Sequence, residues 1–207
     1  MVVAEVLVVL AIILGSLVIH ENAHAIVALR LGDPTAQQQG RITLNPIAHL
    51  DIVGSLILPL FLFVATGSAF GYAKPVPVNR FMLRNGDRGF AIVALAGPVS
   101  NMLIAIVAAF VLRLTGPGPL GVVLRVIQLN VLLAAFNLIP IPPLDGSRLI
   151  RPFVGRGGVQ LLDRIEPYGF LLLFALLYLV RPPYFPFDLI GWFVQNISGL
   201  LIRLLPL

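Results

Sequence analysis

The chain has 207 residues, of which 58% are hydrophobic and only 11% are charged. Soluble domains carry about 25% charged residues, so this composition excludes an ordinary soluble protein and indicates a membrane protein. The net charge of +5 does not indicate nucleic-acid binding, because the basic residues lie in short loops between apolar runs. The chain has no cysteine, which excludes a disulfide framework and leaves His, Asp and Glu as metal ligands.

The apolar runs predict membrane-spanning helices, each of which needs about 20 residues. The first covers residues 2–31. We interpret it as a retained helix rather than a signal peptide, because it lacks a basic n-region and continues through an ionisable cluster. Further spans are predicted at residues 90–114 and 120–139, with a short one at 168–180. The last apolar run, 187–205, either spans the membrane or lies in its interface.

The segment at residues 52–65 is apolar but short, and the Gly- and Pro-rich stretch after it cannot sustain a helix. If this segment enters the membrane and returns, with "AFGYAKPV" as an extended arm, most basic residues fall on one side. These are Arg30, Arg41, Lys74, Arg80, Arg84, Arg88, Arg148, Arg151, Arg156, Arg164 and Arg203. Only Arg113, Arg125 and Arg181 fall on the other side. The positive-inside rule therefore favours a re-entrant segment over a full crossing.

The elements together predict an all-α polytopic membrane protein. It has about five to six transmembrane helices plus a re-entrant hairpin or extended segment around residues 41–77. Re-entrant backbone is tolerated only where protein covers it or where it lines a wet cavity. This segment is therefore a first indication of a site inside the membrane.

The first predicted helix carries His20, Glu21 and His24 in the middle of its apolar run. An ionisable residue at mid-membrane costs about 2.5–3.5 kcal/mol on the insertion scale, so a compensating interaction is expected. The sequence "HENAH" matches H-E-x-x-H, and residues i and i+4 share one helix face, so both imidazoles can bind one ion. Two neutral imidazoles leave room on zinc for a carboxylate and a water. We therefore predict a zinc site with His20 and His24 as ligands and Glu21 beside it.

A third ligand must come from elsewhere in the chain, and Asp145 in "FNLIPIPPLDGSR" is the candidate. The prolines before it break the span at 120–139, and Gly146 permits a sharp turn. This unwound backbone carries a carboxylate toward the side of the membrane where the two histidines lie. The alternative, an ordinary surface turn, suits "PPLDG" in isolation, but the predicted topology favours a ligand.

These motifs resemble the site-2 protease family of intramembrane zinc metalloproteases, in its compact bacterial form without PDZ or CBS domains. The resemblance covers nearly the whole chain, through "HENAHA", "GRITLNPIAHLD", "FGYAKPVPVN", "AGPVSN" and "FNLIPIPPLDG". It implies one zinc per chain with His20, His24 and Asp145 as ligands, and Glu21 as the catalytic acid/base. It also implies that Asn137 is a contact for the substrate or the oxyanion.

Several other residues have less specific interpretations. Asn101 lies on a stripe of small residues that includes Gly97; packing is favoured for Gly97, while packing and a role in the site are both open for Asn101. Asn45, beside Pro46, either binds unwound substrate backbone or forms a turn. His49 is expected to be a hydrogen-bonding interfacial residue rather than a spare metal ligand.

The predicted function is hydrolysis of peptide bonds in or near transmembrane segments of membrane-protein substrates. We expect one integral-membrane domain over residues 1–207, with a catalytic core at about 1–150 and accessory helices at about 165–207. The expected partners are a transmembrane protein substrate and the lipid bilayer, not nucleic acid. The resemblance implies a bacterial plasma membrane, with the active site toward the cytoplasm.

Two other functions are compatible with an intramembrane metal site. A metal-ion transporter would be expected to show paired repeats with broken helices, and none is visible. A non-proteolytic zinc-binding membrane protein would be expected to have lost one of the ligands, and the chain retains all three candidates. The sequence does not set the oligomeric state.

Overall fold

The computed structural model describes residues 2–58, 60, 64, 72, 74–115, 120–180 and 186–206, and these residues form helices and loops without a β-strand. Two of the helices are long and apolar enough to cross a membrane, namely α1 (Val2–Arg30) and α4 (Asp87–Thr115). Each has 29 residues. Such a helix is about 43 Å long, which exceeds the hydrocarbon thickness of a bilayer. The predicted all-α class is confirmed.

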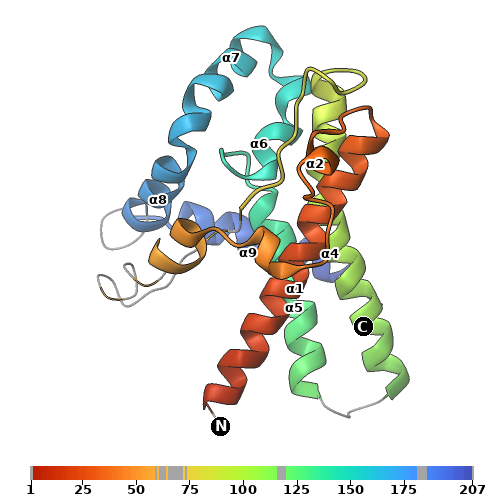
Figure 1. Cartoon of the computed structure of the whole chain (residues 1–207). Helices are drawn as coiled ribbons and strands as arrows, with labels where there is room; N and C mark the ends of the chain where they lie inside the picture. The colour runs from red at the N-terminus through yellow and green to blue at the C-terminus, as the bar shows by residue number, and fades with distance from the viewer. Residues whose placement is uncertain are drawn as a thin grey trace.

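The core of the bundle is formed by α1, α4 and α5 (Leu120–Asn137), with α4 packed against both of the others. Where α4 meets α5, three alanines of α4 face larger apolar side chains: Ala105, Ala108 and Ala109 against Ile127 and Val131. Small residues let helix backbones approach closely. In Figure 1, α1 and α5 rise from the end where the N-terminus lies, and α4 runs in the opposite direction.

The C-terminal helices are shorter than the predicted spans. α8 (Gly169–Leu179) has 11 residues and α9 (Leu189–Ile202) has 14, whereas residues 168–180 and 187–205 were the predicted limits. The start of α9 is set by Asp188, whose Oδ1 accepts a hydrogen bond from the Gly191 N–H at 2.8 Å. Among the described residues, therefore, two helices reach the length of a span, and α5, α8 and α9 are shorter apolar helices.

The predicted re-entrant segment lies partly outside the described residues, at 59, 61–63, 65–71 and 73. The described part of the region around it, residues 41–77, contains two short helices, η1 (Pro46–His49) and η2 (Ile52–Ile57). The segment returns to where it started, because the Tyr72 N–H donates to the Gly54 carbonyl at 3.0 Å and the Lys74 N–H to the His49 carbonyl at 2.8 Å. Residues 74–79 then form an extended segment that leads toward the start of α4 (Figure 1). This segment includes the last three residues of the predicted arm, and from here on the name arm refers to residues 74–79.

The break after α5 positions the next short helix, α6 (Asp145–Leu149). Three prolines lie between the two helices, as the sequence predicted, and Asp145 is the first residue of α6. Gly146 is packed so closely under this turn that a Cβ there would lie 2.5 Å from the Ile139 carbonyl carbon. The turn therefore requires glycine at this position.

An amphipathic helix that the sequence reading did not predict, α7 (Gly155–Ile165), follows α6 and lies with it at the end of the molecule where α1 finishes (Figure 1). Between them, η3 (Arg151–Phe153) carries a buried arginine, Arg151. A further short helix, η4 (Glu166–Tyr168), connects α7 to α8.

Candidate metal centre and active site

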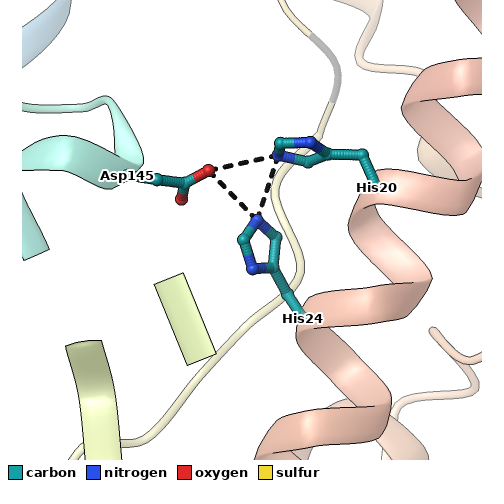
Figure 2. A group of neighbouring side chains, drawn as sticks. All are labelled: His20, His24 and Asp145. Carbon is teal, nitrogen blue, oxygen red and sulfur yellow. Dashed lines mark hydrogen bonds and ion pairs between the residues drawn. The ribbon is translucent and has the colours of Figure 1, made fainter. Parts of the chain in front are cut away.

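Three side chains from α1 and α6 converge on one point. The Nε2 atoms of His20 and His24 lie 3.0 Å apart, and each lies 3.2 Å from Oδ2 of Asp145. Figure 2 shows the two imidazoles on one face of α1, with the Asp145 carboxylate pointing at both from α6. All three residues are buried, with exposed fractions of 3%, 5% and 6%. They form a group that could hold a metal ion.

The chemistry of these donors fits a metal. Nδ1 of His24 lies 2.7 Å from the Val93 carbonyl oxygen, so in the neutral ring Nδ1 carries the proton and Nε2 presents a lone pair. This lone pair faces Asp145 Oδ2, which is buried and has no hydrogen-bond partner among the described residues. Two electron-pair donors held together in a buried place are stabilised by a cation between them.

The spacing of the ligand atoms fits zinc. Zinc–nitrogen and zinc–oxygen bonds of about 2.0–2.2 Å in a tetrahedron place neighbouring ligand atoms about 3.3–3.6 Å apart. The observed separations of 3.0 and 3.2 Å are only a few tenths of an ångström shorter. Metal-bound histidine typically donates its other ring N–H to a carbonyl or carboxylate, as Nδ1 of His24 does to the Val93 carbonyl.

Helix α4 shapes the site although it supplies no ligand. Gly97 faces the two imidazoles, and a Cβ there would lie 2.5 Å from Nε2 of His24 and even closer to the ring of His20. The packing role expected for Gly97 is therefore a contact with the candidate metal ligands. The close approach of α4 to α1 depends on the missing side chain.

Glu21 and the three candidate ligand residues line the same cavity, which has a volume of about 230 Å³. Oε2 of Glu21 accepts a hydrogen bond from the Val76 N–H at 2.8 Å, and Val76 also lines the cavity. Most of the other lining side chains are apolar, and α1, α5 and α8 supply six of them: Ile13, Leu17, Leu133, Phe136, Phe170 and Leu173.

The remaining candidates from the sequence lie in different places. Asn137 lines the cavity, and its Nδ2 donates to the Leu133 carbonyl at 3.0 Å. Asn101 is completely buried in α4, and neither polar atom of its side chain has a hydrogen-bond partner among the described residues. Asn45 is exposed and caps η1 by accepting from the Ile47 N–H at 3.0 Å. His49 is buried and bonds through Nε2 to the Thr43 carbonyl at 2.9 Å.

Arg148 and Asn22 are two residues at or near the site that were not predicted from the sequence. Arg148 lines the cavity, and its Nη1 lies 3.9 Å from Oδ1 of Asp145. The signal was its position three residues after Asp145, which places both on one helix face. Asn22 is buried, and its Nδ2 donates to the Thr43 carbonyl at 2.7 Å, so it ties α1 to the residues before η1.

A cluster of charged side chains connects α7 to the rest of the protein. Nη1 and Nη2 of Arg80 donate to the two carboxylate oxygens of Asp163, at 2.9 and 3.0 Å, and buried Arg151 donates to the same carboxylate. Partial burial raises the pKa of Asp163, but the hydrogen bonds from Arg80 and Arg151 outweigh it and hold this pKa below its ordinary value. The bond to Asp163 in turn raises the pKa of Arg80.

Known proteins with similar sequences are named as zinc metalloproteases. The chain is 38% identical over 172 residues to the protein named "Putative zinc metalloprotease YwhC" of Bacillus subtilis, covering 78% of this chain and 75% of that protein. It is 30% identical over 184 residues to "Putative zinc metalloprotease Rip2" of Mycolicibacterium smegmatis, covering 87% and 70%. It is 32% identical over 103 residues to "Putative zinc metalloprotease MJ0611" of Methanocaldococcus jannaschii, covering 48% and 53%.

No family model matches the chain, and the comparison with solved structures finds no significant match. The first two relatives nevertheless match most of this chain and most of their own length. Their common name agrees with a buried group of two histidines and one aspartate that could hold a metal in a helical, apolar protein. The chain therefore belongs to the site-2 protease family of membrane zinc metalloproteases.

Proposed function

We propose that the chain is an intramembrane zinc endopeptidase with one zinc held by His20, His24 and Asp145. Glu21, from the same H-E-x-x-H motif, is its acid/base, and the LDG motif supplies Asp145. The observation that carries this proposal is the buried triangle of ligand atoms, 3.0–3.2 Å apart, with Glu21 in the wall of the same cavity.

Zinc, Glu21 and Asn137 have different roles in the proposed hydrolysis of a peptide bond. Zinc, when bound, supplies a Lewis acid that polarises the scissile carbonyl and lowers the pKa of water. Glu21 takes the proton from the attacking water and passes it to the leaving amine. It is suited to this role because the i+1 position points about 100° away from His20 around the helix, so its carboxylate lies beside the ligands and not among them. We assign to Asn137, in the same cavity wall, a contact with the substrate or the oxyanion.

The cavity suits an unwound segment of a transmembrane protein as substrate. A helix hides its own amides, so the scissile bond becomes reachable only in an extended chain. The arm has free hydrogen-bonding groups, because the Val76 carbonyl and the Val78 N–H have no partner among the described residues. An extended substrate can add to such an edge, with its side chains against the apolar cavity wall.

We propose that the whole chain is one integral-membrane domain with five to six spans and a re-entrant segment before the arm. Residues 1–150 carry the site and residues 165–207 are accessory. The active site then faces the cytoplasmic side of a bacterial plasma membrane. This orientation is supported by the basic residues around the adjoining ends of α1 and α4, where the Arg84 N–H donates to the Leu31 carbonyl at 2.8 Å.

The test is cleavage of a single-span reporter protein placed in liposomes with the purified chain. We expect cleavage that stops when a zinc chelator is added and returns when zinc is restored. Cleavage that is insensitive to the chelator, in a preparation without zinc, would contradict the proposal. Zinc uptake into the liposomes without cleavage would instead indicate a transporter.

A further inference from the structure

Glu21 is held by a backbone group from a distant part of the chain. The Val76 N–H donates to Oε2 of Glu21 at 2.8 Å, although the two residues are 55 positions apart. The neighbours of Val76 are Pro75 and Pro77, which have no N–H to donate. Val76 therefore carries the single amide proton between Lys74 and Val78, and that proton points at Glu21.

The arm is fixed before Val76 by a buried arginine. Arg41 is 7% exposed, and its guanidinium donates to the carbonyls of Ala48 at 2.5 Å, Lys74 at 2.7 Å and Pro75 at 3.4 Å. Hydrogen bonds from a charged donor are about twice as strong as neutral ones. Arg41 thus joins the η1 region to the two residues immediately before Val76.

The arm is fixed after Val76 by a buried aspartate. Asp33 is 1% exposed, and its Oδ2 accepts a hydrogen bond from the Asn79 N–H at 2.6 Å. The other oxygen of Asp33 accepts from both the N–H and the hydroxyl of Thr35, so the carboxylate itself is held in place. Val76 therefore lies between two anchored points, and its two proline neighbours restrict the backbone further.

We propose that the Val76 N–H is a positioning group for the Glu21 carboxylate, and that Arg41 acts through it. This inference rests on the proposed function, in which Glu21 is the acid/base. The N–H fixes one carboxylate oxygen of a side chain that otherwise has several rotamers. Oε1, which has no hydrogen-bond partner among the described residues, is left to exchange a proton with the water.

The arm consequently both binds the substrate and positions Glu21. The Val78 N–H and the Val76 carbonyl have no partner among the described residues and can bind a substrate, while the Val76 N–H holds Glu21. One backbone segment then sets both the register of the substrate and the direction of the carboxylate. The same anchors, Arg41 and Asp33, serve both tasks.

Amide hydrogen exchange tests the contact without any need for cleavage. Because Pro75 and Pro77 have no amide proton, overlapping peptides that differ by residues 75–77 report Val76 alone. We expect its exchange to be at least ~10-fold faster in Glu21→Ala than in the wild type, and close to the wild-type rate in Glu21→Gln, which keeps an oxygen acceptor. The amide of Asn79, which is bonded to Asp33, should be unchanged in both variants. Equal Val76 exchange in the wild type and Glu21→Ala would overturn the proposal.

Removing the N–H itself tests its effect on the reaction. Incorporation of the α-hydroxy acid that matches valine at position 76 replaces the amide by an ester and keeps the side chain. We expect kcat to fall about 10-fold, since hydrogen bonds to charged groups contribute on this scale, with zinc content and KM unchanged. A merely structural role would change zinc content, KM or unfolding temperature instead. Unchanged kcat would contradict the inference.

Arg41→Lys, which keeps the charge but loses the planar fork, gives a third comparison. It should speed Val76 exchange and lower kcat in the same direction as the ester, whereas Arg88→Lys, at an exposed position, should do neither. Slow, wild-type exchange of Val76 in Arg41→Lys would remove Arg41 from the account. If the wild type cleaved no reporter at all, the proposed function would fail, while the exchange result would still decide whether Val76 holds Glu21.

Discussion

The carbonyl oxygen of Val93 on α4 lies 2.7 Å from Nδ1 of His24 on α1, and this contact determines which nitrogen of His24 faces Asp145. A carbonyl only accepts hydrogen bonds, so Nδ1 carries the proton and Nε2 is the free donor of an electron pair. One turn further along α4, Gly97 leaves the space that the two imidazoles occupy. α4 therefore shapes the candidate metal site, although none of the three candidate ligands lies on it.

Gly97→Ala should reduce zinc binding although it changes no ligand. The added methyl overlaps both imidazoles, so either the rings or α4 must move. We expect at least ~10-fold weaker zinc affinity, the scale seen when the support of metal ligands is lost, measured by competition with a chelator. Gly15→Ala on α1 is the matched control, because a Cβ there meets nothing within 4 Å. Zinc affinity in Gly97→Ala equal to that of the control would show that the site does not depend on this packing.

Alanine at His20, His24 or Asp145 should empty the site. Elemental analysis of the purified wild type should give about one zinc per chain, as for a site with three protein ligands and an open position. His49→Ala should keep its zinc, because His49 is bonded to the Thr43 carbonyl and is not in the ligand group. Full zinc content in Asp145→Ala would remove Asp145 from the ligand set.

Labelling of single cysteines should place the basic loops on one side of the membrane. The chain contains no cysteine, so each added residue is unique. Arg84→Cys and Gly157→Cys should be modified from the cytoplasmic side, and Thr115→Cys, at the far end of α4, from outside. If Arg84→Cys and Gly157→Cys reported opposite faces, the re-entrant arrangement of residues 52–77 would be wrong.

The ion cluster on α7 should make stability depend on pH at the acid end. The pKa of Asp163 is lowered in the folded protein, so its contribution is present above the unfolded value of about 4 and is lost as the pH falls through the folded value. Asp163→Asn should lower the free energy of unfolding by about 1 kcal/mol at pH 7, a modest figure because the carboxylate is 36% exposed. Unfolding of wild type and variant in detergent should converge as the pH is lowered from 5 to 2. A gap that widened over this range would contradict the assignment.

The parts of the structure that could be predicted are those marked by residues close together in the sequence, such as an apolar run, a fixed spacing or a cluster of prolines. The apolar runs predicted α1, α4 and α5 to within a few residues, and the i, i+4 spacing of His20 and His24 placed both imidazoles on one face. Asp145 could be associated with them because prolines and a glycine marked an unwound turn around it. The role of each of these residues as a metal ligand stays a prediction.

The parts that the sequence did not predict depend on tertiary contacts. α7 begins with three glycines in its first four residues, which have low helix propensity, and Asp163 ties it to Arg80 and Arg151. The bond from Val76 to Glu21 uses a backbone N–H, which every residue except proline has, so no residue type marks it. Asn22 is a polar residue in an apolar helix, and besides the Val18 carbonyl of its own helix it donates to the Thr43 carbonyl, a tertiary contact that the sequence does not mark.

In the proposed function, Glu21 moves the proton during a zinc-dependent cleavage of peptide bonds. Glu21→Gln keeps the size of the side chain and can still accept the hydrogen bond from Val76, but it cannot take a proton. The most direct measurement is the cleavage rate of a membrane-spanning reporter by Glu21→Gln, with zinc content determined on the same sample. We predict wild-type zinc content and cleavage at least ~10²-fold slower, the usual scale for loss of a general base. Cleavage at a near wild-type rate by the zinc-loaded variant would contradict the protease mechanism.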